Sequence, residues 1–141
     1  MRYSVVAVGR VKDAALRAAC DEYLGRLRHY ARVEEREVKD EARLSGVIPG
    51  DSRLVALSRR GEPWSSRELA ERTARWEVDG QDVVLAIGGA DALPDEILRR
   101  AELVWSLSAL TLPHELARLI VLEQLYRAFS IRRGEPYHRG P

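Results

Sequence analysis

The chain has 141 residues, of which 45% are hydrophobic and 32% are charged, and its formal net charge at pH 7 is +1. This length and composition predict one folded domain, residues 1–141, and the near-neutral charge excludes a global electrostatic attraction to nucleic acid. No apolar stretch approaches the roughly 20 residues that span a membrane, and the N-terminus lacks the apolar core of a signal peptide, so we expect a cytoplasmic protein with no membrane partner.

The N-terminal part of the sequence predicts a buried strand followed by an amphipathic helix. The stretch Tyr3–Val8 is rich in β-branched residues, as buried strands are. Asp13 is a suitable N-cap for a helix that runs to about His29 and has its apolar side chains on one face. Cys20 lies on that face, so we interpret it as a core residue rather than a nucleophile. As the single cysteine, it cannot form an internal disulfide.

Two further strands and a helix are predicted in the middle of the chain. Residues 32–38 are highly charged and alternate weakly, which favours an edge strand, whereas residues 53–57 (Arg-Leu-Val-Ala-Leu) predict a second buried strand. Residues 58–64 are expected to form a loop at the C-terminal end of that strand. Ser65 and Glu68 have the spacing of a capping box, so a helix is expected to start there.

The clearest strand is Val83–Ile87, which is entirely apolar and runs into Gly88 and Gly89. Pro94, followed by two acids that oppose the positive end of a helix dipole, predicts the start of a further helix. Residues 103–107 predict a fourth buried strand. The alternation of strands and helices predicts an α/β fold, with a parallel sheet and helices on both faces.

The last predicted helix covers about residues 113–131, because Pro113 already has the backbone angle of a first helical position. Its apolar stripe includes Val121 and Leu125 and is wider than one sheet face needs, which indicates a subunit contact. Glu123 and Arg127 have the i, i+4 spacing of an ion pair and are expected on the solvent side.

Three strand ends are candidates for a ligand site, because parallel strands end at the same edge of a sheet, where open α/β folds bind ligands. These ends are Leu57, Gly88 and Leu107. Residues 107–112 have no charged side chain and suit a flat heteroaromatic group such as adenine; an ordinary strand–helix connector is the alternative. The chain lacks G-x-x-x-x-G-K and G-x-G-x-x-G, which disfavours ATP and NAD.

Metal binding is not expected, because His29, His114, His138 and Cys20 do not have the spacing of metal ligands. His114 stands in the first turn of the last helix. It is either a functional base or a histidine that helps to cap the helix, and the sequence does not distinguish the two.

The C-terminal tail is basic and aromatic. From Arg127 onward it has four arginines and one acid, with Tyr137 and His138 among them. Basic residues beside aromatic ones suit phosphate contacts and base stacking. A solvated, frayed tail is the alternative interpretation.

Several stretches resemble the RlmH family, bacterial methyltransferases that modify N3 of a pseudouridine in large-subunit ribosomal RNA. They are Leu85-Ala-Ile-Gly-Gly-Ala-Asp-Ala-Leu93, Trp105-Ser-Leu-Ser-Ala-Leu-Thr-Leu-Pro-His114, Leu125-Tyr-Arg-Ala-Phe-Ser130 and Pro136-Tyr-His-Arg139. The opening Val6-Ala-Val-Gly9 and the loop Gly61-Glu-Pro-Trp64 also match, so the resemblance spans almost the whole chain.

The resemblance implies a SPOUT-type fold, with the C-terminal segment threaded through a deep trefoil knot, and a homodimer. It also implies S-adenosylmethionine-dependent methylation of 23S ribosomal RNA, within the large subunit or the assembled ribosome. By position, the implied S-adenosylmethionine contacts are Leu57, Gly88, Leu107, Ser108, Ala109, Leu110, Thr111 and Leu112.

Further roles are our hypothesis for a protein of this family. His114 and His138 are candidates for the catalytic group that accepts the imide proton, with a water molecule as the alternative, and the candidate RNA-binding residues are Arg133, Tyr137, His138 and Arg139. In a dimer, the tail of one subunit is expected to complete the site of the other.

The chain departs from the family at two places. The region between Val38 and Arg53 is shorter than in many members, which have a lysine-rich loop and an extra helix there, and residues 90–92 (Ala-Asp-Ala) replace a frequent Pro-acid-Gly turn.

Two other functions are considered: a related methyltransferase that acts on another RNA, such as tRNA, and a non-catalytic ribosome-associated protein. The uncharged stretch 107–112 argues against the second, because a pure RNA binder has little need of an apolar adenine slot.

Overall fold

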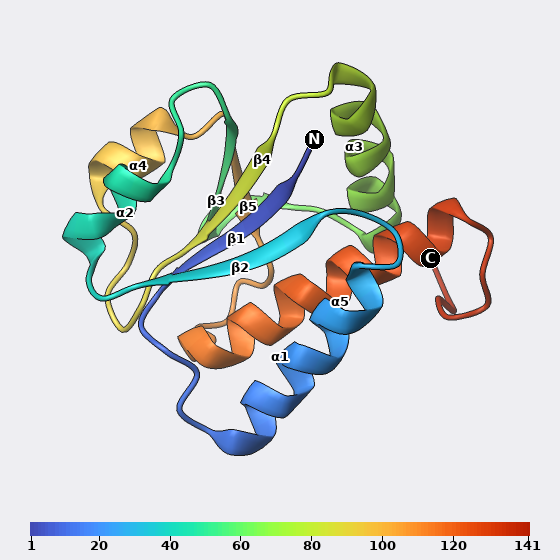
Figure 1. Ribbon diagram of the computed structural model, residues 1–141, viewed down its shortest axis with the longest axis horizontal. Coiled ribbons are helices and arrows are strands. Elements are labelled where there is room, and N and C mark those ends of the chain that lie inside the picture. The colour runs from blue at the N-terminus through green and yellow to red at the C-terminus, as the bar shows by residue number, and fades with distance from the viewer.

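A five-stranded parallel sheet organises the computed structural model, which describes residues 1–141 (Figure 1). The strand order is β2-β1-β4-β3-β5, and every neighbouring pair is parallel. The strands are β1 (Tyr3–Val8), β2 (Val33–Val38), β3 (Arg53–Pro63), β4 (Val83–Ile87) and β5 (Leu103–Ser106). The predicted parallel α/β fold is therefore confirmed, with the charged stretch β2 at one edge.

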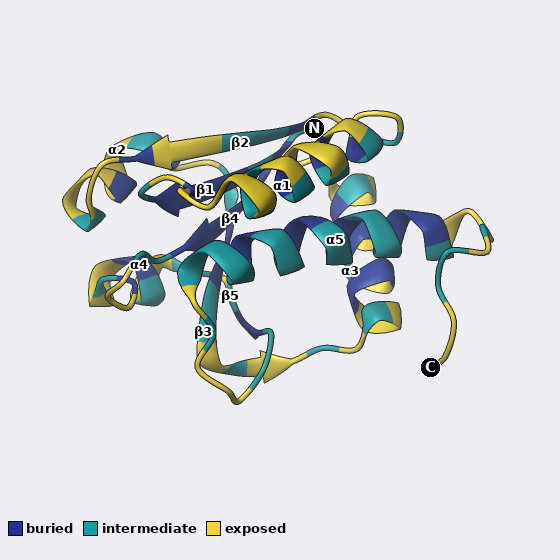
Figure 2. Ribbon diagram, turned by 90° about the horizontal axis from the view of Figure 1, so that it is seen from below, coloured by how far each residue is buried: buried dark blue, intermediate teal, exposed yellow.

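Helices cover both faces of this sheet. They are α1 (Ala14–Leu27), the 3-10 helix η1 (Glu41–Arg43), α2 (Leu44–Val47), α3 (Ser66–Asp79), α4 (Asp95–Arg100) and α5 (His114–Arg132). Successive strand residues point to opposite faces, so Val5 packs with α1, α3 and α5, whereas Val6 packs with α2 and α4. Figure 2 shows the buried strands between these helical layers. No helix has both the length and the apolarity to cross a membrane.

The local signals in the sequence act where they were expected. The Asp13 carboxylate accepts a hydrogen bond from the amide of Leu16 at 2.9 Å, which caps α1, and the Ser65 hydroxyl accepts one from Glu68 at 3.1 Å, which caps α3. Helix α3 ends at Gly80, whose φ of 77° lies in the left-handed region. Cys20 is fully buried in the core, as predicted, and burial raises the pKa of its thiol.

Strand β3 extends past the predicted loop. Residues Val55–Leu57 pair with the start of β5, and after a register shift Glu62 and Pro63 pair with Trp105 and Ser106. The chain therefore continues beside β5 beyond Leu57, in the same parallel direction, rather than leaving the sheet there. Gly61 permits this, because a Cβ there would lie 2.5 Å from the carbonyl oxygen of Val104.

The outer face of α5 also differs from the prediction. Val121 and Leu125 are fully buried core residues rather than a spare flank, and the apolar residues left partly exposed include Leu116 and Ile120. Glu123 and Arg127 pair as expected but are largely covered, with exposed side-chain fractions of 18% and 24%. They are covered because the C-terminal tail folds back over this side of the helix.

Candidate functional site

A cavity of about 460 Å³ opens at the carboxyl edge of β3, β4 and β5. Every residue expected to contact S-adenosylmethionine lines it except Ala109, which is exposed. The three strand ends at Leu57, Gly88 and Leu107 therefore do meet, because β3 pairs with both β4 and β5 in parallel register. The first turn of α5 and part of α4 complete the wall.

Gly88 forms the floor of this cavity and admits no larger residue. A Cβ there would lie 2.8 Å from the carbonyl oxygen of Asp91 and 3.1 Å from the amide of Leu93. The chain turns back on itself over residues 88–93, so the floor is backbone rather than side chain. Main-chain groups can consequently approach a ligand closely.

Serine side chains shape the uncharged stretch of residues 107–112. The Ser108 hydroxyl accepts a hydrogen bond from the amide of Leu110 at 3.0 Å, and the Ser106 hydroxyl lies 3.1 Å from the carbonyl oxygens of both Arg59 and Ser108. These contacts hold the loop against β3 without charged groups. Leu110 is left 72% exposed at the rim, where a ligand or partner could cover it.

His114 is the titratable side chain that α5 contributes to the cavity. Its Nδ1 atom is buried and has no hydrogen-bond partner, and the N-terminus of α5 has no side-chain cap. Because the imidazole lines the cavity, it is placed to accept a proton from a bound group. The capping role considered from the sequence has no hydrogen bond to support it.

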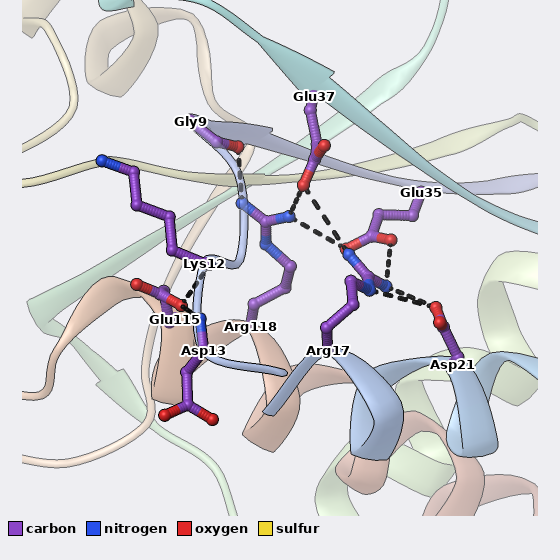
Figure 3. Close-up of polar contacts among 9 residues, drawn as sticks. All are labelled: Gly9, Lys12, Asp13, Arg17, Asp21, Glu35, Glu37, Glu115 and Arg118. Carbon is purple, nitrogen blue, oxygen red and sulfur yellow. Dashed lines mark hydrogen bonds and ion pairs between the residues drawn. The ribbon is translucent and has the colours of Figure 1, made fainter. Parts of the chain in front are cut away.

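The start of α5 is fixed by a buried ionic network (Figure 3). Arg118 is fully buried, forms ion pairs with Glu35 and Glu37 of β2, and donates a hydrogen bond to the carbonyl oxygen of Gly9 at 2.9 Å. Arg17 of α1 also pairs with Glu35 at 2.6 Å, and this hydrogen bond raises the pKa of Arg17. Two cations and two carboxylates thus share one site, which lowers the cost of burying them. No local pattern in the sequence predicts this network.

A second contact anchors the same turn of α5. The Glu115 carboxylate accepts hydrogen bonds from the amides of Lys12 and Asp13 at 2.7 and 3.1 Å. Because His114 is the neighbouring residue, the connection between β1 and α1 holds one wall of the cavity in place.

The C-terminal tail lies at the other end of α5 (Figure 1). This helix has 19 residues and is therefore about 28 Å long. The Tyr137 hydroxyl donates to Glu123 at 2.7 Å and lies 3.0 Å from that of Tyr23, and Arg127 contacts His138 Nδ1 at 3.1 Å. Within one chain, His138 therefore lies beside Arg127, roughly 20 Å along the axis of α5 from His114 at the cavity.

The other tail residues have different environments. Tyr137 packs its ring between Tyr126 and the guanidinium group of Arg127, and burial raises the pKa of its hydroxyl. Its ring is therefore not free to stack on a base. Arg133 and Arg139 are exposed. No group of three or more His, Cys, Asp or Glu side chains is placed to hold a metal ion.

Comparison with known proteins agrees with this geometry. Residues 1–138 match the family described as "Predicted SPOUT methyltransferase". A relative from Sorangium cellulosum, named ribosomal RNA large subunit methyltransferase H, is 47% identical and is aligned over 97% of this chain and 99% of its own length. A protein of the same name from Burkholderia thailandensis is 39% identical, with 99% of each chain covered.

Two solved structures share the fold at low sequence identity. A probable methylase family protein from Haemophilus influenzae Rd KW20 has a TM-score of 0.66 at 13% identity, covering 98% of this chain and 70% of its own. A probable methyltransferase from Bordetella pertussis Tohama I has a TM-score of 0.60 at 14% identity, covering 91% and 93%. Both likenesses concern the fold alone.

Proposed function

The chain belongs to the SPOUT methyltransferase family, and from this premise we propose that it transfers a methyl group from S-adenosylmethionine to N3 of a pseudouridine in 23S ribosomal RNA. One structural observation supports the proposal independently of the names of the relatives. The residues implied by sequence resemblance to bind the methyl donor line one cavity, with an uncharged loop on one side and a glycine floor.

The cavity fits the donor by its chemistry. Leu57, Leu107 and Leu112 supply apolar walls for an adenine ring, and the backbone of residues 107–112 offers amide and carbonyl groups to its edge. Gly88 leaves room for the ribose to approach the backbone. When bound, S-adenosylmethionine supplies an electrophilic methyl group on a sulfonium.

The proposed chemistry needs a proton acceptor, because an imide N–H is a poor nucleophile until its proton leaves. His114 is the candidate within the same chain, since its imidazole side chain lines the cavity. A cavity that excludes water favours attack of the resulting anion on a cationic donor, because the charge separation falls as they react.

A homodimer would explain how the C-terminal tail, which lies away from the cavity of its own chain, takes part in the site. The His138 ring lies beside Arg127 of α5, roughly 20 Å along the helix axis from His114, so His138 and Arg139 would serve the cavity of a second copy of the chain. The partly exposed apolar residues Leu116 and Ile120, together with Leu110 at the rim, offer a surface for that copy. In this arrangement each tail completes the partner's site and contacts RNA through Arg133, His138 and Arg139.

The family also implies a trefoil knot, a rare exception to the usual rules of chain topology. The match of residues 1–138 to the SPOUT methyltransferase family supports this proposal.

Mass spectrometry of ribosomal RNA from cells with and without the protein tests the function. We expect loss of one methylated pseudouridine from 23S RNA in the deletion strain, and its return with the parent gene. A lost methyl group on tRNA would favour a related methyltransferase instead. Calorimetry addresses the remaining alternative: a folded protein that does not bind S-adenosylmethionine would favour a non-catalytic RNA binder.

A further inference from the structure

Two arginines at the rim of the cavity have no role in the site described so far. Arg59 and Arg60 lie in the part of β3 beyond Leu57. Both residues line the cavity, and both are exposed. The Arg59 guanidinium group donates one long hydrogen bond, of 3.5 Å, to the Thr111 hydroxyl on the opposite loop. The two cations therefore stand beside residues proposed to hold the methyl donor.

The backbone under these side chains is fixed. The Arg59 carbonyl oxygen accepts a hydrogen bond from Ser106 at 3.1 Å, and the Arg60 amide donates to the Ser58 hydroxyl at 3.3 Å. Gly61 then packs directly against the backbone of β5. Arg59 and Arg60 lie between the two segments of β3 that pair with β5, so the paired residues Leu57 and Glu62 hold the backbone of both arginines at the rim.

Neither arginine is neutralised. No carboxylate lies within ion-pair distance of Arg59 or Arg60, and the nearest acid in sequence, Glu62, pairs with Arg72 at 3.5 Å instead. Two adjacent like charges repel each other, so an anion bound between or beside them would relieve that repulsion. Asp91 and Asp95 line the cavity as well, but they come from the loop after β4 and from α4.

We propose that Arg59 and Arg60 bind the phosphodiester backbone of the substrate RNA next to the nucleotide that enters the cavity. The inference rests on the proposed function, because it assumes an RNA base in this cavity. Two features favour phosphates over the carboxylate of the methyl donor. Both side chains are exposed and, apart from the long contact of Arg59 with Thr111, neither is held in one direction, so the pair can contact successive phosphates of a chain rather than closing on one small anion.

Asp91 and Asp95 determine on which side of the cavity the RNA backbone lies. Phosphates approach the Arg59 and Arg60 side of the rim and are repelled from the side of Asp91 and Asp95. The strand of RNA therefore passes along β3 and β5 rather than over α4.

The test compares Arg59→Gln/Arg60→Gln with Arg36→Gln/Arg75→Gln. The control removes the same charge from two exposed arginines that form no ion pair and do not line the cavity. Filter binding to unmethylated large ribosomal subunits is measured from 50 to 200 mM salt, and S-adenosylmethionine affinity is measured by calorimetry. Each phosphate that the protein no longer neutralises lowers the slope of log affinity against log salt by roughly 0.7–0.9.

We expect the rim variant to bind subunits about tenfold more weakly at low salt, with a reduced salt slope and unchanged S-adenosylmethionine affinity. An unchanged slope with weaker S-adenosylmethionine binding would assign the arginines to the donor carboxylate and overturn the inference. Equal reductions in both variants would also overturn it. Binding is scored apart from methylation, so a parent protein that binds subunits without methylating them would refute only the proposed function.

Discussion

The guanidinium group of Arg118 in α5 donates a 2.9 Å hydrogen bond to the carbonyl oxygen of Gly9, the residue that follows β1. This contact joins the wall of the proposed donor site to β1, which lies next to the edge strand β2 in the sheet. It is built around a cation with no exposed surface, which is tolerable only because Glu35 and Glu37 face it from β2.

Replacing Arg118 by methionine should destabilise the fold by about 3 kcal/mol, because Glu35 and Glu37 then share the single guanidinium group of Arg17 with Asp21. Urea unfolding measures the difference. Arg43→Met is the control, since Arg43 is 62% exposed and its pair with Asp40 spans 3.7 Å, so its loss should cost about 0.5 kcal/mol or less. Similar destabilisation in the two variants would mean that the buried network contributes no more to the free energy of unfolding than an exposed ion pair does.

Gly88→Ala should weaken donor binding and also destabilise the fold, because the new Cβ would lie 2.8 Å from a backbone carbonyl oxygen that has to shift. The new Cβ would press on the backbone of Asp91 and Leu93, so the floor of the cavity must move. A displacement that costs about 1.4 kcal/mol or more in binding weakens affinity at least about tenfold, which calorimetry with S-adenosylmethionine detects.

The matched control for that substitution is Gly25→Ala in α1, where a Cβ meets nothing within 4 Å. It should keep parental affinity and gain slightly in stability, because alanine favours helix. Unchanged donor binding in Gly88→Ala would place the donor elsewhere on the molecule.

Alkaline pH should destabilise the protein through Tyr30. Its hydroxyl donates to Glu135 at 2.6 Å, and this hydrogen bond raises the pKa of Tyr30 from 10.0 to about 12. The unfolded chain therefore loses this proton before the folded one does. The stabilisation is complete below pH 10 and disappears as the pH rises toward 12.

Urea unfolding at successive pH values checks this. We expect the unfolding free energy of the parent to fall over that range, and that of Tyr30→Phe to fall less steeply, because one titrating group is gone. Parallel curves across the whole range would contradict the assignment.

His114→Ala should lower the turnover number by about 10²- to 10⁴-fold, the usual contribution of a positioned proton acceptor. S-adenosylmethionine affinity should change little by comparison. A pH–rate profile adds a distinct readout, since the acidic limb of the parent profile should disappear in the variant. Parental turnover in His114→Ala would assign proton removal to another group.

Some elements follow directly from local sequence. Strand β4 has the predicted bounds, because five consecutive apolar residues from Val83 to Ile87 are flanked by Asp82 and Gly88. The cavity follows in turn, since parallel strands place their ends at one edge. What could be predicted here depended on short-range pattern and on a general rule of α/β sheets.

Other features depend on partners that are distant in the chain. Residues 58–63 have no strand pattern, and their extended state comes from pairing with Trp105 and Ser106. Arg118 and Glu123 are ordinary charged residues in a helix by sequence. They are covered because β2 supplies carboxylates to the first and the tail folds over the second. No pattern within α5 carries that information.

The proposed dimer makes the most specific prediction, because it divides each site between two chains. One parent carries His114→Ala with an intact tail, and the other carries His138→Ala/Arg139→Ala with an intact cavity. Each homodimer should be nearly inactive. In a co-expressed mixed dimer, one site combines both defects and the other combines the intact cavity with the intact tail, as two-fold symmetry requires.

Random pairing makes half of the dimers mixed, so methylation should recover to roughly a quarter of the parental rate. Mixing is verified by different affinity tags on the two chains. Because the contact between His138 and Arg127 places the tail roughly 20 Å along α5 from His114, recovered activity in the mixed dimer would come from the tail of the partner chain. Activity that stays at the level of the two homodimers would show that the tail does not serve the partner's cavity.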